Sequence, residues 1–565
     1  MRTLNPDELK RVSGDVFGRI YEYFLTQFAD QKAHDGGEFF TPVSLVSLIA
    51  NVIEPECGTV LDPACGSGGM FVQSARFVEH RRQNPTEKLT FYGLEKNATT
   101  IRLAKMNLAV HGLEGDIQKA ITYYDDPHEL LGKADFVMAN PPFNVDEIDA
   151  DKVKNDPRLP FGLPGVNKKG KVSNGNYIWI SYFYSYLGEK GRAGFVMSSQ
   201  ASSAGRDEAK VRQKLIETGD VDIMIAIRSN FFYTRTVPCE LWFLNRAKPE
   251  EYRGKVLMID ARNVYRKVTR KIYDFSPEQQ RNVLAIVWLY RGQKDRFLGL
   301  VSDYCSRMLT DASACFTDTD DEGNEIEPLP AFSASTRALH EALQPFLDTL
   351  PDDGPQAEVL KEFEDAQTIF QADMAAFKEA MTKEQAAWKK QKTTNGALKE
   401  AVGRLAPLAE TSRDLVKQAD LLYKLACRLI ETCENECGAR KSEAWQSREI
   451  TRARKAADES RQLAVTQLKQ VRYFHRQARW LTERFPEAKL CDVEGLVKLV
   501  DRAEIEANDW SLTPGRYVGV APEEEDDDFD FEEALREIHV ELEDLNAEAV
   551  KLAEKIRKNF EELGV

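Results

Sequence analysis

The sequence predicts an α/β fold in which short helices precede a mostly parallel sheet and a long helical region follows it. From Gly58 onward, short apolar runs that end in Gly, Asp or Asn alternate with helical stretches. This alternation is typical of a parallel sheet with both faces covered. Residues 335–485 are rich in Ala, Lys, Glu, Gln and Leu and hold few strand-like runs, which favours long helices. Near the C-terminus, apolar residues at alternating steps of three and four predict a coiled-coil-like helix.

Residues 1–56 are predicted to form a helical N-terminal segment. The apolar residues that recur there at helical spacing are Val16, Phe17, Ile20, Tyr23, Phe24 and Phe28. The tract HDGGEFFTP interrupts this pattern, because two adjacent glycines and a proline disfavour a continuous helix. A second, short helix is expected from Val43 to Ile53.

Residues 57–310 are predicted to form the α/β domain. Its candidate strands are the runs TVLD, LTFYGLE, ADFVMA, RAGFVMSS, VDIMIAI and ELWFLN. The last of these follows a tight VPC segment and is expected to pair as a late, hairpin-type strand, whereas the others are expected to be mostly parallel.

The remaining chain divides by composition into a polar linker (311–334), a helical region (335–485) broken by Pro407 and Gly438, and a C-terminal segment (486–565). That last segment contains LTPGRYV, the acidic run EEEDDDFDFEE and a final helix. The apolar stripe of this helix consists of Leu535, Ile538, Leu542, Leu545, Ala549, Leu552 and Ile556. Such a stripe has to pack on something, either the body of the chain or a partner subunit.

Composition limits the class of protein. A chain of 565 residues is too long for one domain, and 42% hydrophobic with 30% charged residues describes a globular protein. No run is long enough to span a membrane, no secretory signal is apparent, and the nine scattered cysteines suit a reducing compartment, so a cytoplasmic location is expected. Cys427, Cys433 and Cys437 lack paired CxxC spacing and a nearby His, so no metal site is expected.

The net charge of −16 is concentrated in one part of the chain. Residues 523–544 hold 13 acidic residues and one Arg, whereas residues 440–484 hold 12 Lys and Arg against 5 Asp and Glu. The rest of the chain is therefore close to neutral and has one basic stretch. DNA is not excluded as a partner.

The glycine-rich tract LDPACGSGG, residues 61–69, lies between a predicted strand and a predicted helix. Glycines at such a turn allow the backbone to approach a ligand that would collide with a Cβ atom. The spacing matches neither a P-loop nor the GxGxxG pattern of dinucleotide binding. Taken alone, the tract is compatible with a ligand-binding turn and with an ordinary tight turn.

Glu95 ends the next predicted strand, LTFYGLE. A carboxylate at a strand end can accept hydrogen bonds from both hydroxyls of a ribose. Without other evidence, a carboxylate at a strand end could equally be a charge exposed to solvent. Because a glycine turn precedes it, Glu95 is predicted to bind the ribose of a nucleoside-bearing cofactor.

The strand Asp135–Ala139 runs directly into Asn140, Pro141, Pro142 and Phe143. The two prolines remove two backbone donors and stiffen the loop. The amide oxygen of Asn140 and the carbonyl of Pro141 would then be two acceptors for one amino group, and Phe143 would offer a stacking face. Two acceptors stabilise the positive charge that develops on nitrogen as it attacks a methyl group. These four residues are the predicted catalytic site.

The order of these motifs resembles amino-methyltransferases that use S-adenosylmethionine. More narrowly, residues 15–300 resemble the modification (M) subunit of type I restriction-modification systems, an adenine-specific DNA methyltransferase family. The resemblance is carried by GRIYEYFL, GGEFFTP, LDPACGSGGMF, NLAVHG, ANPPF and GRAGFVMSS, with LTPGRYV near the C-terminus. It implies a Rossmann-like, S-adenosylmethionine-dependent methyltransferase sheet.

The resemblance also implies site residues. Those expected to bind the cofactor are Glu38, Phe39, Phe40, Thr41, Pro42, Asp62, Ala64, Gly66, Ser67, Gly68, Glu95 and Thr122. Adenine, flipped out of the duplex, would enter the pocket at Asn140 and stack on Phe143. The cluster Phe231–Tyr233, with Phe232 at its centre, would stack on the other face of the base, although core aromatics near a strand are an alternative for it.

The resemblance implies partners as well. No zinc-finger or helix-turn-helix signature is present, so recognition of double-stranded DNA is expected to belong to a separate specificity (S) subunit. A restriction/translocase (R) subunit would supply cleavage, since no ATPase motif is visible. The final helix and LTPGRYV are the expected docking surface.

The sequence departs from the family pattern and leaves other functions open. Only 35 residues precede GGEFFTP, where such subunits usually have a longer helical domain. Thr234-Arg235-Thr236 stands where a Gly-rich turn is commoner, and the helical region at 335–485 is longer than the resemblance leads us to expect. NPPF alone would also suit an enzyme that methylates a protein glutamine or RNA. An inactive scaffold in a defence complex is the other alternative.

Overall fold

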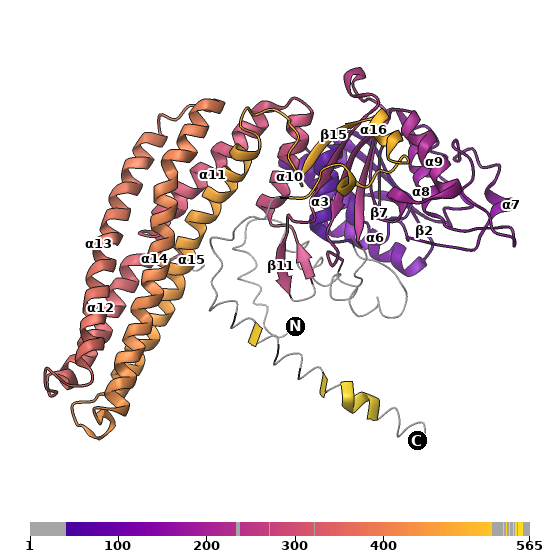
Figure 1. Ribbon diagram of the computed structural model, residues 1–565. Helices are drawn as coiled ribbons and strands as arrows, with labels where there is room; N and C mark the ends of the chain where they lie inside the picture. Colours follow the sequence, from indigo (N-terminus) through magenta and orange to yellow (C-terminus); the bar gives the residue numbers. More distant parts are fainter. Residues whose placement is uncertain are drawn as a thin grey trace. The chain divides into compact units, whose positions relative to one another are not determined.

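The computed structural model describes residues 41–232, 238–269, 272–320 and 323–521, and separate residues between Leu535 and Arg557 (Figure 1). The chain divides into two compact units. One contains residues 41–280 and 491–521, and the other contains residues 281–490. The predicted helix around Val16–Phe28 lies outside the described residues.

The first unit is built on a mostly parallel sheet, which confirms the predicted α/β class. Within the described residues its strand order is β15-β10-β8-β9-β7-β4-β1-β2-β3. Parallel ladders join β3, β2, β1, β4 and β7, and a further one joins β8 to β10. The segment ELWFLN is β9, which runs antiparallel between β7 and β8. The strands are β1 (Gly58–Asp62), β2 (Leu89–Glu95), β3 (Gly115–Lys119), β4 (Ala134–Ala139), β7 (Leu187–Ser198), β8 (Val221–Ile227), β9 (Cys239–Asn245), β10 (Lys255–Asp260) and β15 (Val497–Asp501).

Helices pack on this sheet through their apolar residues. Helix α3 (Val43–Ile53) has the predicted bounds and packs on β4 and β7, as does α8 (Asn176–Tyr186), while α6 (Ala98–Val110) packs on β2 and β3. Nearly every side chain of α8 is buried, which accounts for its almost continuous apolar and aromatic sequence. The shorter or peripheral elements of this unit are the helices α4 (Gly69–His80), α5 (Pro85–Lys88), α7 (Ala150–Val153), α9 (Arg206–Glu217) and α16 (Arg502–Ala507). Two antiparallel strand pairs complete it, β5 (Ile148–Asp149) with β6 (Lys171–Val172) and β11 (Arg266–Thr269) with β12 (Ile272–Asp274). The boundary between the two units falls inside α10 (Pro277–Tyr290).

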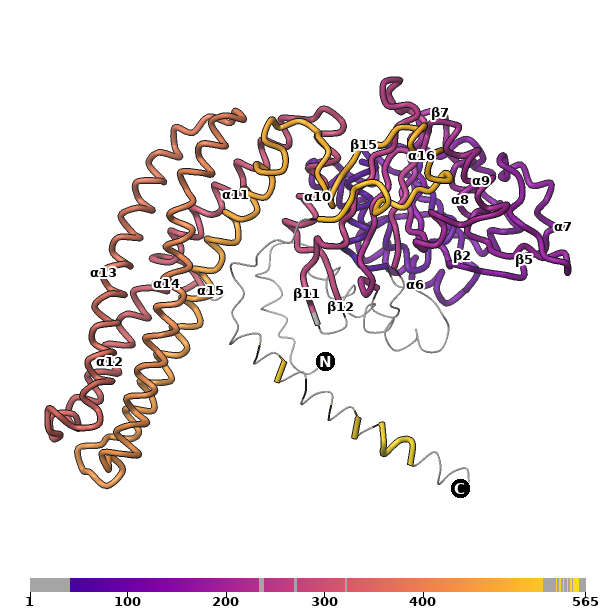
Figure 2. Tube along the Cα trace, in the orientation of Figure 1, coloured from indigo at the N-terminus to yellow at the C-terminus, as the bar shows by residue number. Residues whose placement is uncertain are grey.

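The second unit is a bundle of long helices that run side by side (Figure 2). They are α11 (Lys294–Ala314), α12 (Pro328–Leu347), α13 (Ala357–Trp388), α14 (Asn395–Asn435) and α15 (Ser447–Arg484), with the hairpin β13 (Asp318–Thr319) and β14 (Glu325–Ile326) between α11 and α12. Helix α15 packs along α11, α12 and α14. The expected boundaries at 310 and 334 therefore lie inside α11 and α12.

One helix break expected in this region is absent. Gly438 does separate α14 from α15, but Pro407 lies inside α14. A proline in a helix removes one backbone hydrogen bond and crowds the preceding turn. Leu405 and Leu408 are buried on either side of it, so packing holds the helix through this point.

The C-terminal segment returns to the sheet. Strand β15 pairs antiparallel with β10 and forms the edge of the sheet. Leu512, Tyr517 and Val518 of LTPGRYV are buried, so these apolar side chains are not available to a partner, unlike the expectation that this segment is a docking surface. Arg212, only 2% exposed, holds the segment in place by donating from Nε to the Trp510 carbonyl at 2.6 Å.

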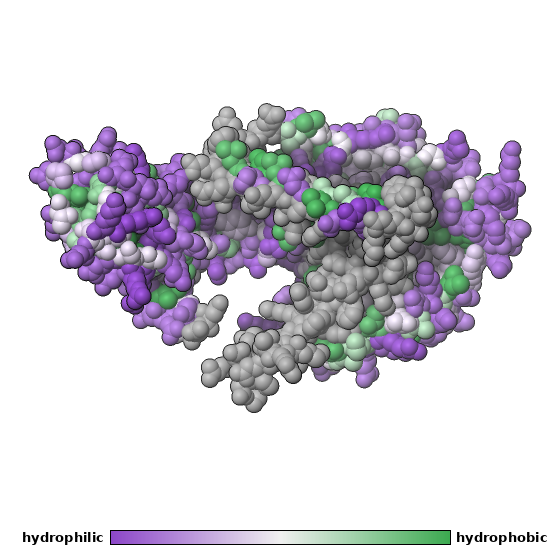
Figure 3. All heavy atoms as spheres, turned by 90° about the horizontal axis from the view of Figure 1, so that it is seen from below, coloured by the Kyte–Doolittle hydropathy of each residue, from purple (hydrophilic) through white to green (hydrophobic). Residues whose placement is uncertain are grey.

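The described residues of the C-terminal helix remain at the surface. Leu535, Ile538 and Leu542 are 48%, 51% and 53% exposed. Elsewhere, the face of the molecule in Figure 3 is largely hydrophilic, with hydrophobic side chains in small patches. No helix in the described part of the chain combines the length and the apolar character that a membrane span requires.

Candidate functional site

The predicted motifs meet at one edge of the sheet. Strand β1 pairs with β2 on one side and with β4 on the other, so the order of strands along the chain reverses at β1. The loops after β1 and β4 therefore leave the sheet on either side of this point, which is where ligands bind in open α/β sheets. These two loops are the glycine turn and NPPF.

A pocket of about 600 Å³, counting its open mouth, lies between the two loops. Six of the predicted site residues line it: Thr41, Asp62, Ala64, Gly66, Ser67 and Asn140. The structure thus brings together residues from three separate motifs.

Two glycines shape the turn that forms one wall of the pocket. Gly66 and Gly68 have φ values of +51° and +79°, a left-handed conformation that disfavours any residue with a Cβ atom. The Gly68 N–H donates to the Cys65 carbonyl at 2.8 Å, and α4 begins at the next residue. The first N–H groups of α4 lack partners within the helix and carry partial positive charge.

Asp62 is a buried carboxyl at the end of β1. It is 1% exposed, and its Oδ1 accepts the Ala64 N–H at 3.0 Å. Burial raises its pKa to about 8, against the lowering effect of the Ala64 hydrogen bond, and the negative charge of Glu95 raises it further. The ligand-free pocket therefore holds Asp62 protonated near neutral pH, and a positively charged ligand would favour its ionised form.

Replacement of Asp62 by Asn is expected to change how stability depends on pH. The pKa of Asp62 is about 8 in the folded chain and near 3.8 in the unfolded one, so between these values the folded state binds more protons. This group therefore contributes stability that falls as pH rises from about 4 to about 8. Melting temperatures of the ligand-free chain, measured from pH 5 to 8.5, should fall more steeply for wild type than for Asp62→Asn. Parallel curves for the two proteins would contradict the burial of this carboxyl.

Asn140 is fixed by a residue from a distant motif. Its Nδ2 donates to Thr41 Oγ1 at 2.8 Å, which orients the amide. Its Oδ1 is buried and has no hydrogen-bond partner among the described residues. A buried acceptor without a partner costs about 1–3 kcal/mol. A ligand N–H group at this point of the pocket would recover that free energy.

Asn107 is a site residue that the sequence interpretation did not assign, although it starts the quoted NLAVHG motif. It is 2% exposed, lines the pocket and donates from Nδ2 to the Ser67 carbonyl at 2.9 Å. Its Oδ1 is buried and, in the described part of the chain, unpaired. The signal available in the sequence was a polar Asn within an otherwise apolar stretch of the helix that follows the second strand. Such a side chain, once buried, needs a hydrogen-bond partner, and the glycine turn supplies one.

Glu95 and Thr122 lie near the pocket but do not line it. Glu95 Oε1 accepts the Asn97 N–H at 2.9 Å, and its charge acts on Asp62. Thr122 is buried and donates from Oγ1 to the Pro63 carbonyl at 2.6 Å. Its hydroxyl thus fastens its own loop to the glycine turn.

The predicted base-stacking residues lie in different surroundings. Phe143 is half-buried and packs against the core, and Pro141 is buried while Pro142 is exposed. Phe232 is buried, with 5% exposure, at the end of a described stretch. Neither Phe232 nor Phe143 lines the pocket between the two loops. Glu38, Phe39, Phe40 and Tyr233 lie outside the described residues.

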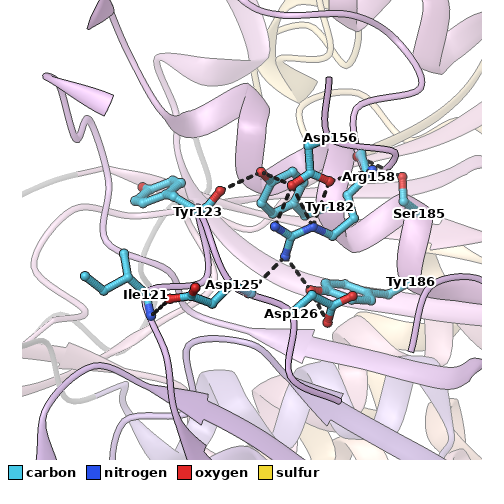
Figure 4. A network of polar contacts seen from close by, with 9 residues as sticks. All are labelled: Ile121, Tyr123, Asp125, Asp126, Asp156, Arg158, Tyr182, Ser185 and Tyr186. Atoms are coloured by element: carbon cyan, nitrogen blue, oxygen red, sulfur yellow. Dashed lines mark hydrogen bonds and ion pairs between the residues drawn. The ribbon is translucent and has the colours of Figure 1, made fainter. Parts of the chain in front are cut away.

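A polar network centred on Arg158 supports the loops around the site (Figure 4). Its guanidinium is paired with Asp156 at 2.7 Å and donates to Tyr186 Oη at 2.9 Å and to the Asp125 carbonyl at 3.3 Å. The guanidinium also lies 4.0 Å from the ring centroid of Tyr182. Although burial raises the pKa of Asp156, the hydrogen bonds and charge of Arg158 lower it overall. The network joins the segment after β3 to the segment before α8.

Within the described residues, no group of three or more His, Cys, Asp or Glu side chains is arranged to hold a metal ion. Cys427, Cys433 and Cys437 are free thiols. Burial raises the pKa of each of these thiols.

The fold and the pocket define an α/β protein with a ligand site at the glycine turn where the strand order reverses. The chain matches the N-6 DNA methylase family over residues 12–306. This match covers more than half of the 565 residues, and the chain belongs to that family.

The chain is similar to two curated type I restriction enzyme methylase subunits. It is 40% identical over 285 residues to the MjaIX subunit of Methanocaldococcus jannaschii, covering 50% of each chain. It is 36% identical over 278 residues to the HindI subunit of Haemophilus influenzae, covering 49% of this chain and 61% of the relative. The matched region thus spans about half the length of these relatives.

Among solved structures, a type I restriction-modification system methyltransferase subunit from Streptococcus thermophilus is similar. The likeness has a TM-score of 0.42 and 24% identity, over 49% of this chain and 58% of that one.

Proposed function

We propose that this chain is the modification subunit of a type I-like restriction-modification complex and methylates the exocyclic amino group of a flipped adenine in double-stranded DNA. The observation that carries the proposal is the buried Oδ1 of Asn140, which has no partner in the part of the chain that the structure describes and belongs to an amide oriented by Thr41. Membership of the N-6 DNA methylase family and similarity to type I methylase subunits support it.

The pocket suits S-adenosylmethionine as the cofactor. Asp62 and the Asn107 Oδ1 would accept hydrogen bonds from its ammonium group, and the turn at Gly66 would leave room for the methionine end of the cofactor. Glu95 would accept from its ribose hydroxyls. When bound, the cofactor supplies an electrophilic methyl group. Glu38, Phe39, Phe40, Pro42 and Thr122 stay predictions for this site.

The residues of the chain would act mainly by positioning. Adenine inside a duplex is out of reach, so the base has to be flipped into the pocket beside Asn140. The Asn140 Oδ1 and the Pro141 carbonyl would accept the two N–H bonds of the amino group and stabilise the charge that develops on nitrogen. Phe143 would stack on the base. No strong base is required beforehand, because the amino proton becomes acidic only as the new bond forms.

The partners follow from this function. A specificity subunit would select the DNA sequence and a restriction/translocase subunit would cleave, as the resemblance to type I systems implies. The relatives are named as methylase subunits of type I restriction enzymes, which agrees with a division of labour among subunits. The exposed apolar residues Leu535, Ile538 and Leu542 suit docking on a partner helix. A DNA substrate agrees with the cytoplasmic location expected from the sequence.

Asn107→Ala is expected to weaken binding of S-adenosylmethionine by roughly 5- to 20-fold, since it removes one acceptor and releases the Ser67 carbonyl. Titration calorimetry of the full chain measures this change. Asn51→Ala is the matched control, because Asn51 is a half-buried helical Asn that donates only within its own helix, to the Ser47 carbonyl at 2.8 Å and to Ser47 Oγ at 3.3 Å. Equal affinity in the Asn107→Ala variant and wild type would exclude Asn107 from the cofactor site.

The direct test is transfer of a labelled methyl group from S-adenosylmethionine to duplex DNA, with the modified base identified. The full chain is assayed with and without its specificity partner. N6-methyladenine that forms with the partner supports the proposal. Cofactor binding without methyladenine in either condition would refute it and favour a protein or RNA substrate, and no cofactor binding would favour an inactive scaffold.

A further inference from the structure

Three asparagines fasten the end of the NPPF loop to helix α8. Asn144 directly follows Phe143, and its N–H donates to Asn176 Oδ1 at 2.8 Å. The Asn144 Oδ1 accepts from Asn176 Nδ2 at 2.9 Å and from Asn174 Nδ2 at 3.1 Å. Asn174 Oδ1 in turn accepts the Asn176 N–H at 2.9 Å, which closes the cluster.

The backbone adds a contact at Gly175. The Gly175 N–H donates to the Val145 carbonyl at 2.8 Å. A Cβ atom at Gly175 would lie 2.7 Å from Ile148 Cδ1 and 3.0 Å from Tyr123 Oη, so a larger residue here would have to displace these side-chain ends. We call Asn144, Asn174, Gly175 and Asn176 the asparagine clamp.

The clamp connects the loop to a rigid element. Asn176 is 1% exposed, and Tyr177, Ile180 and Phe183 of α8 are fully buried. At the other end of α8, Tyr186 contacts Arg158 in the network of Figure 4. Strand β4 fixes the loop at Ala139, and the clamp fixes it at Asn144, so only the four catalytic residues lie between two anchored points.

Because Asn144 is exposed, its hydrogen bonds can order the loop locally while adding little to the stability of the whole chain. Asn144 is exposed and has a φ of +55°, a left-handed conformation that Asn tolerates better than most residues. Hydrogen bonds of an exposed side chain exchange readily with water and contribute little to overall stability. The same bonds restrict the torsions of the residue that follows Phe143.

We propose that the asparagine clamp is a positioning device that holds Asn140 and Phe143 in the geometry needed for methyl transfer. This inference rests on the proposed function. The clamp residues contact the loop and not the substrate, so they act through Asn140 and Phe143. Their loss affects the rate of transfer rather than binding of the cofactor, whose pocket lies at the glycine turn.

The test uses Asn144→Gly, which keeps the left-handed backbone accessible and removes only the accepted hydrogen bonds. In the complex used for the wild-type assay, kcat is expected to fall roughly 10- to 100-fold. The Kd for S-adenosylmethionine is expected to change by no more than about two-fold, because the interaction lost does not touch the cofactor. Asn144→Asp keeps both acceptor bonds and is expected to retain most of kcat.

Asn167→Ala is the matched control in the same connection between β4 and α8. Its Oδ1 accepts the Lys169 and Lys171 N–H groups at 2.9 and 3.1 Å, away from the NPPF loop, and kcat is expected to remain unchanged. Hydrogen exchange of the peptide covering residues 140–146 should quicken in Asn144→Gly and not in this control.

The outcomes separate the two proposals. Wild type that transfers no methyl group to DNA refutes the proposed function. Active wild type with an equally active Asn144→Gly refutes the clamp alone. A loss of kcat together with cofactor affinity and melting temperature would make Asn144 a folding determinant, which also overturns the positioning role.

Discussion

Asn140→Ala is expected to reduce kcat for methyl transfer by roughly 100- to 1,000-fold, as removal of one preorganised hydrogen-bonding group at a developing charge does elsewhere. The Kd for S-adenosylmethionine should stay close to that of wild type. The reason is that the Asn140 Oδ1 is buried and unpaired among the described residues, so its acceptor capacity is available to the amino group of the proposed substrate. Single-turnover kinetics and titration calorimetry of the same preparation separate the two quantities.

Thr41→Val provides the companion measurement. It removes Thr41 Oγ1, which accepts a hydrogen bond from Asn140 Nδ2 at 2.8 Å, and it nearly preserves the volume of the side chain. A smaller loss of kcat is expected, because the amide can then rotate but remains present. If Asn140→Ala lowers cofactor affinity and kcat equally, Asn140 shapes the pocket and does not serve the transfer step.

Truncation is expected to have the largest effect on stability. A chain that ends at Leu490 lacks β15 and leaves the Arg212 guanidinium, 2% exposed, without the carbonyls of Asp509 and Trp510. Removing the partners of a buried charge costs several kcal/mol. This chain should be insoluble or melt far below wild type. A chain that ends at Ala521 should keep its melting temperature and cofactor binding and lose association with the specificity subunit.

Arg212→Met in the full chain tests the same contact without removing a segment. It deletes the charge together with its hydrogen bonds, so it should destabilise the chain much less than the truncation at Leu490 does. Circular dichroism melting measures both. A stable, soluble chain ending at Leu490 would show that residues 491–521 are dispensable for the fold.

The part of the fold that was predictable from sequence is the part that local pattern determines. The bounds of α3 follow from helical spacing bounded by Pro42 and the end of the apolar run. ELWFLN is predicted to be a strand because four of its six residues are consecutive and apolar or aromatic, in a β-prone order. The glycine turn was recognisable because only glycine accepts the φ of Gly68 without strain.

What the sequence could not reveal depends on contacts between distant residues. The bond between Thr41 and Asn140 joins positions 99 apart, and that between Arg212 and Trp510 joins positions 298 apart. Local pattern carries no information on such pairs. For the same reason, the return of residues 491–521 to the sheet was not foreseen, and the break expected at Pro407 was wrong, because tertiary packing overrode the local preference of proline.

The path of the chain through the sheet has a consequence for synthesis on the ribosome. The neighbour of β10 at the sheet edge, β15, lies beyond the whole helical unit of residues 281–490. At roughly 5–20 residues per second, β10 emerges some tens of seconds before β15 is translated. During that interval the nascent chain presents a strand with an unpaired edge, a typical starting point for aggregation. Chaperone demand should therefore peak while the helical unit is being made, and slow codons within it would lower the yield of native protein.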